Sequence, residues 1–110
     1  MNMACALFEL LKLFYEDFDE FCKKIEKFKE LGVLSEVYIN KEKGIVWARG
    51  QTGTGAGLVR NMDPITAFVQ LNLMFYGMYF PYLPDAEIAF KKVKEWWKEK
   101  FKKISKHTER

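Results

Sequence analysis

Apolar residues recur along the first part of the chain at steps that alternate between four and three positions. The series begins at Leu7 and ends at Phe28, and this spacing places its members on one face of a helix. Gly32 follows where a C-terminal cap is expected. The pattern predicts one long helix within residues 1–32, with an apolar face formed by Leu7, Leu11, Phe14, Phe18, Phe21, Ile25 and Phe28.

Two short runs rich in β-branched and aromatic residues come next, at residues 33–40 and 44–49. A polar connection that ends in Gly44 separates them, which predicts a β-hairpin. Residues 57–60 are a candidate for a short third strand. We therefore expect residues 33–60 to form a hairpin and a glycine-rich loop.

The second half of the chain begins with a strong helix start, because Asp63 can serve as N-cap and Pro64 fits the first turn. This helix should end near Phe80, before two prolines. Asp85 then caps a last amphipathic helix with the apolar stripe Ala86, Phe90, Val93, Trp97, Phe101 and Ile104.

Together these elements predict a single α+β domain over residues 1–110. Its parts are a long N-terminal helix, the hairpin with its candidate third strand, the glycine-rich loop, and two helices within residues 63–105. The first of these two helices is apolar, and the second is amphipathic. Residues 106–110 should form a frayed tail.

Residues 64–84 carry no formal charge. A helix that is apolar all round must be buried all round, and a chain of 110 residues has little with which to cover it. We therefore expect a homo-oligomer, most simply a homodimer. The residues assigned to its interface are Phe68, Met74, Phe75, Met78, Tyr79, Tyr82 and Trp96.

Charge is unevenly distributed. Residues 1–31 hold five lysines against seven acids, whereas residues 85–110 hold nine basic residues against five acids. A strip of lysines on the last helix is a solvated face, a site for nucleic-acid phosphates, or a contact with the acidic first helix of a neighbouring molecule. In the second case Arg49, Arg60 and Trp47 would form a second binding edge, with the strip made of Lys91, Lys94, Lys98 and Lys102. Many Lys and Glu with few Gln and Ser are typical of hyperthermophile proteins.

The glycine-rich stretch offers a further alternative. Gly53, Gly55 and Gly57 resemble phosphate-binding loops, in which backbone N–H groups approach an anion. However, no Gly-Lys-Ser/Thr ending follows, and Leu58 stands where a dinucleotide fingerprint needs its third glycine. A connector or a hairpin end is the alternative to a phosphate or nucleotide site.

Little in the sequence points to catalysis. His107 lies in the expected tail, and neither serine has a base nearby. Cys5 and Cys22 would lie about 25 Å apart on one helix, too far for a disulfide. Acidic residues 16–20 fit a solvated helix surface, so we expect no metal site and no cofactor.

Residues 65–80 are too few to span a membrane, and the N-terminus has no basic region like that of a secretory signal. We expect a cytoplasmic protein. The sequence predicts a non-enzymatic oligomeric interaction or regulatory module without a small-molecule ligand. Nucleic-acid binding through the lysine strip is the alternative, and nucleotide binding through the glycine loop is a second one.

Overall fold

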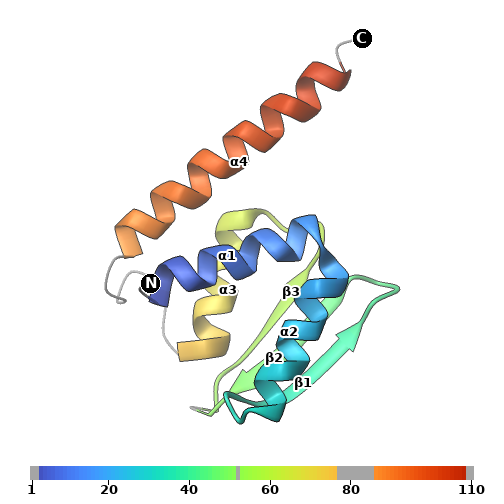
Figure 1. Cartoon of the computed structure of the whole chain (residues 1–110), viewed down its shortest axis with the longest axis vertical. Helices are drawn as coiled ribbons and strands as arrows, with labels where there is room; N and C mark the ends of the chain where they lie inside the picture. The colour runs from blue at the N-terminus through green and yellow to red at the C-terminus, as the bar shows by residue number, and fades with distance from the viewer. Residues whose placement is uncertain (1–2, 52, 77–85, 109–110) are drawn as a thin grey trace.

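The computed structural model describes residues 3–51, 53–76 and 86–108, and side chains over residues 6–51, 53–75 and 87–100. The described part is an α+β fold with four helices and a three-stranded antiparallel sheet, which confirms the predicted class (Figure 1). The element order is α1 (Met3–Glu16), α2 (Phe18–Glu30), β1 (Leu34–Asn40), β2 (Ile45–Gly50), β3 (Gly55–Val59), α3 (Pro64–Tyr76) and α4 (Ala86–Thr108).

The prediction of one long N-terminal helix is wrong, because the chain divides into α1 and α2 at Asp17. Asp17 has a non-helical backbone (φ −148°, ψ 80°), and its Oδ1 accepts a hydrogen bond from the N–H of Glu20 at 3.1 Å. Aspartate caps a new helix better than it continues an old one. The break directs α2 onto β1, while α1 packs on α3 and α4. The predicted apolar face survives the break, since Phe14 and Phe21 on either side of it are both fully buried.

The end of α2 confirms the cap predicted at Gly32. This glycine has a φ of 81°, in the left-handed region where glycine is favoured. The N–H of Val33 donates to the carbonyl of Phe28 at 2.9 Å, which closes the last turn of the helix.

The sheet has the order β1-β2-β3, so the candidate third strand is present. It starts at Gly55, two residues before the predicted start at residue 57. Much of the expected glycine loop is therefore strand, which corrects the assignment of Gly55 and Gly57 to a loop. Gly53 alone of the three lies in the turn between β2 and β3, with a φ of 89°.

Helix α3 lies at the centre of the molecule, where it packs on β2 and β3 and also contacts α1 and α4 (Figure 1). Its predicted start is confirmed, because the N–H of Thr66 donates to Oδ1 of Asp63 at 3.0 Å. Phe68 and Met74 are fully buried within this one chain, so both belong to its core rather than to a surface open to a partner. Phe75 is half-buried. The predicted continuation to residue 80, and interface residues Met78, Tyr79 and Tyr82, lie outside the described residues.

Helix α4 is the longest element, and its C-terminal turns extend past the rest of the molecule (Figure 1). Val93 of the predicted apolar stripe is fully buried, and so is Ala89 one turn before it. The helix runs to Thr108, which places part of the predicted tail within it.

Candidate interaction surface on the open face of the sheet

Helices cover one face of the sheet, and the other face has no helix packed on it in the described part of the chain. Val46, Ala48 and Leu58 point toward the helices and are fully buried. The alternate positions point the other way, because successive side chains of a strand lie on opposite faces. Within the described residues these side chains are half-buried or exposed. They form what we call the open face: Glu36, Tyr38, Asn40, Ile45, Trp47, Arg49, Gly55, Gly57 and Val59.

Large apolar side chains occupy the middle of the open face. The strand register places Tyr38 opposite Trp47 and Ile45 opposite Val59. Tyr38 is 55% exposed and Val59 is 38% exposed. Cross-strand neighbours of this kind lie close enough to touch, so the four side chains form one continuous apolar area.

Gly55 of β3 makes room for the indole of Trp47, which also lies near Gly57. A Cβ added at Gly55 would lie 2.6 Å from Cζ2 of Trp47, and one added at Gly57 would lie 3.7 Å from its Cδ1. The ring therefore lies across the backbone of β3. Glycine is a poor strand former, and here its absent side chain allows an aromatic ring to cover the strand.

Charges on the open face cancel. A guanidinium nitrogen of Arg49 donates to Oε1 of Glu36 at 2.6 Å across β1 and β2. Both side chains are substantially exposed, so the pair contributes no more than about 1 kcal/mol to stability. The open face is therefore apolar and formally neutral.

Arg60 does not join Arg49. The guanidinium of Arg60 lies 5.0 Å from the ring centre of Phe18 and donates to the carbonyl of Tyr15 at 3.4 Å. Both of these residues belong to the helical layer, whereas Arg49 is on the open face. The predicted second edge with Arg49, Arg60 and Trp47 together is not formed.

The lysine strip is also separate from the sheet. Lys91, Lys94 and Lys98 are exposed on α4, which packs on α1 and α3. The ammonium group of Lys94 lies 4.6 Å from the ring centre of Phe90 on the same helix. The side chain of Lys102 lies outside the described residues. These lysines thus lie on a helix that contacts α1 and α3, whereas Arg49 lies on the open face of the sheet.

The glycines do not form a cradle of free N–H groups. The N–H of Gly53 donates to the carbonyl of Gly50 at 3.0 Å, which closes the β2–β3 turn. The N–H of Gly57 donates to Oε1 of Gln70 on α3 at 3.3 Å. Both groups are therefore engaged in holding the fold, which supports the hairpin-end interpretation over an anion site.

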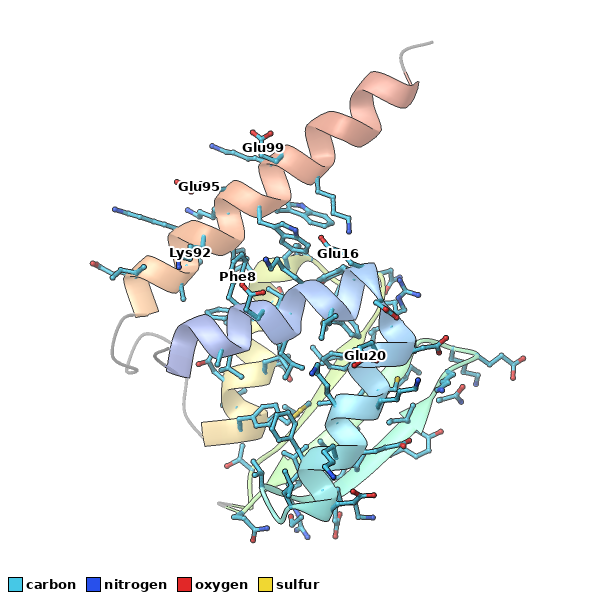
Figure 2. The ribbon with its side chains drawn as sticks, in the orientation of Figure 1. Phe8, Glu16, Glu20, Lys92, Glu95 and Glu99 are labelled. Atoms are coloured by element: carbon cyan, nitrogen blue, oxygen red, sulfur yellow. The ribbon has the colours of Figure 1, made fainter. Side chains whose placement is uncertain are left out.

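The acidic residues near the α1–α2 break have individual structural partners. Glu16 accepts a hydrogen bond from Nε1 of Trp96 at 3.0 Å (Figure 2). Asp19 lies 3.6 Å from the ammonium group of Lys41. Asp17 caps α2. No group of three or more His, Cys, Asp or Glu in the described part of the chain could hold a metal ion.

Trp96, assigned to the oligomer interface from sequence, is anchored inside this chain. Its ring meets Phe8 edge-on at 6.3 Å and lies 5.8 Å from the ring of Tyr15 (Figure 2 labels Phe8). The hydroxyl of Tyr15 donates to the carbonyl of Met62 at 2.6 Å. Burial, and then the charge of Asp63, raises the pKa of Tyr15 well above its ordinary value. This aromatic cluster joins α4 to α1.

The remaining reactive side chains also have structural surroundings. Cys22 is buried, and burial raises the pKa of its thiol, which makes a thiolate harder to form. The hydroxyl of Ser35 donates to the carbonyls of Arg49 and Gly50. The side chains of Cys5 and His107 lie outside the described residues. Among the described residues we find no nucleophile paired with a base.

Sequence reasoning missed two features. The first is Tyr38, whose exposure beside Trp47 depends on the strand register. The second is an apolar hollow of about 380 Å³ between α1, α2 and the end of α3. Its lining includes Leu7, Leu10, Leu13, Phe28, Val33 and Phe75.

None of the described helices combines the length and the apolar character needed to cross a membrane. Comparisons of the chain with protein-family models, with curated proteins and with solved structures gave no match.

Proposed function

We propose that this protein is a non-enzymatic interaction module that works as a homo-oligomer, most simply a dimer, and that its working surface is the sheet. The observation that carries the proposal is the open face, where Tyr38, Ile45, Trp47 and Val59 lie without helical cover among the described residues. A contiguous apolar area on a folded chain commonly marks a contact with another protein.

The chemistry of the open face favours a protein partner over a nucleic acid. Nucleic-acid binding needs several cations that face the same phosphate backbone. Among the residues of the open face only Arg49 is a cation, and it is paired with Glu36, while the lysine strip lies on α4, which packs on α1 and α3. A neutral surface with aromatic side chains resembles the centre of a protein interface.

In the described part of the chain, helix α3 does not leave a large apolar surface open for an oligomer contact. The described part of α3 is largely enclosed by its own chain, so surplus apolar surface on that helix no longer carries the argument. The sheet takes its place. Three strands about 4.8 Å apart and about six residues long have a footprint of only about 300 Å². Self-association through the sheet should therefore be weak and dependent on concentration.

Light scattering on the full chain tests the proposal. We expect the mass to rise from 13.0 kDa toward twice that value as the concentration increases from about 5 µM to about 500 µM. Tyr38→Glu should weaken this rise, because Tyr38 lies on β1 and each copy would then bring a carboxylate to the contact between the two sheets. The matched control is Ile88→Glu, which changes an apolar residue of similar exposure (51%) on α4 and should leave the rise intact. A constant mass of 13.0 kDa over the whole range would refute the proposal.

A further inference from the structure

We propose that two copies of this chain join through antiparallel pairing of β1 with β1 of the second copy, so that the two sheets become one sheet of six strands. This inference rests on the self-association proposed above and specifies its geometry. It concerns the outer edge of β1, which has no neighbouring strand in the described structure.

The hydrogen bonds of the sheet identify the backbone groups at this edge. The N–H of Gly50 donates to the carbonyl of Thr54, and the carbonyl of Gly44 accepts from the N–H of Arg60. Even-numbered residues of β2 therefore direct their backbone groups toward β3. In an antiparallel ladder the odd-numbered ones then point toward β1.

The register completes the assignment. Trp47 pairs with Tyr38, so the backbone groups of Tyr38 are used within the sheet. Those of Val37 and Ile39 must point outward, because alternate residues of a strand point to opposite sides. These outward N–H and C=O groups are what a second β1 strand would bind.

The two edges of the sheet are protected differently. At the β3 edge the outward N–H of Gly57 is capped by the side chain of Gln70. Strand β3 is also short, with five residues of which two are glycine. Strand β1 has seven residues and contains neither proline nor lysine, and its one register shift lies near its start, between Leu34 and Glu36, which leaves the part with Val37 and Ile39 regular. A long edge strand without such protection is a template for pairing with another chain.

The surroundings of β1 suit a second copy. A hollow of about 390 Å³ lies between α2 and β1, lined by Glu26, Lys29, Glu30, Val37 and Ile39. Val37 and Ile39 are only half-buried there, so a neighbouring copy could complete their burial. The hollow presents both signs of charge, so a two-fold axis can set Lys29 of one copy near a glutamate of the other.

Charge does not oppose the pairing of β1 with itself. Glu36 is the single charged residue of the strand, and it is held by Arg49 of its own sheet. Pairing at the edge also leaves the open face uncovered. The Tyr38–Trp47 pairs of both copies would then lie on one continuous surface, twice the width of the surface in one copy.

A proline at the edge tests this geometry. Val37→Pro removes an outward N–H while the bonds between β1 and β2 stay in place, since edge strands tolerate proline where the N–H points away from the sheet. Val37→Ala is the matched control, because it shortens the side chain but keeps the N–H. Because the dimer is two-fold symmetric, Val37→Pro removes two hydrogen bonds per dimer. We expect the dissociation constant of the Val37→Pro dimer to be at least about 30-fold larger than that of the Val37→Ala dimer.

Hydrogen exchange on the unmodified chain gives an independent measurement, which decides the question if Val37→Pro does not fold. The amides of Val37 and Ile39 should exchange more slowly as the concentration increases, while the amide of Gly57 should not change. A dimer whose Val37 and Ile39 amides exchange at a constant rate would overturn the edge pairing and leave self-association intact. A chain that stays monomeric would refute both proposals.

Discussion

The close approach of β2 to α3 can be tested at Gly50, the last residue of β2. Gly50 is buried, and a Cβ added there would overlap the carbonyl oxygen of Met74 in the last turns of α3. The carbonyl oxygen of Phe75 also lies within 3.8 Å of that position. These atoms belong to the backbone, so a rotation of a side chain cannot make room for the added methyl group.

The cost of Gly50→Ala follows from this overlap. The end of α3 must move away from the sheet, and overpacking of this kind costs about 1–3 kcal/mol. Alanine also restricts the unfolded chain, which returns about 0.4–1 kcal/mol. We expect a net loss of about 1–2 kcal/mol in the free energy of unfolding, or a drop of about 5–10 °C in Tm.

Gly55→Ala is the matched control on the neighbouring strand. The atom nearest to its added Cβ is Cζ2 of Trp47, at the far end of a side chain on the open face. That ring can move toward solvent without any shift of the backbone, so we expect the free energy of unfolding to fall by no more than about 1 kcal/mol, less than for Gly50→Ala. Both variants are compared with the unmodified chain by urea unfolding, followed by circular dichroism at one protein concentration. Equal stability of Gly50→Ala and Gly55→Ala would refute the close packing of β2 on α3.

Two further predictions concern α1 and α2. Tyr15→Phe should lower the free energy of unfolding by about 1 kcal/mol, because it removes the hydrogen bond to the carbonyl of Met62. The raised pKa of Tyr15 means that its contribution is complete below its ordinary pKa of 10.0 and declines above it. The Tm of the unmodified chain should therefore fall more steeply above pH 10.0 than that of Tyr15→Phe, and parallel curves would contradict this reasoning. Asp17→Ala should cost about 1 kcal/mol in chemical denaturation through loss of the α2 cap. The control Asp19→Ala removes an exposed ion pair with Lys41 and a charge in the first turn of α2 but keeps the cap, and should cost less.

Local chemistry in the sequence was enough to place most of the elements. Asp63 and Pro64 define the start of α3 within a few residues of chain, and Gly32 ends α2 through its own backbone angle. The apolar spacing from Leu7 to Phe28 identifies the buried face on both sides of Asp17. These features depend on neighbours close in sequence, so no knowledge of the fold is needed to read them.

The division at Asp17 and the third strand required tertiary structure. An isolated stretch with heptad spacing can remain a single helix, and the change of direction is favoured because α2 can then pack on β1. Gly55 and Gly57 have a low preference for strands, yet they lie in β3. Pairing with β2 and cover by Trp47 outweigh that local preference.

The candidate surface was the least predictable part of the molecule. The sequence identified Trp47 and Arg49 but grouped them with Arg60, which the fold places in the helical layer. Tyr38 becomes part of the surface through the register of β1 on β2 alone. Sequence by itself determined most of the helical segments, the first hairpin and which residues are apolar. The tertiary structure decided which apolar residues remain exposed, because exposure depends on contacts between segments far apart in the chain.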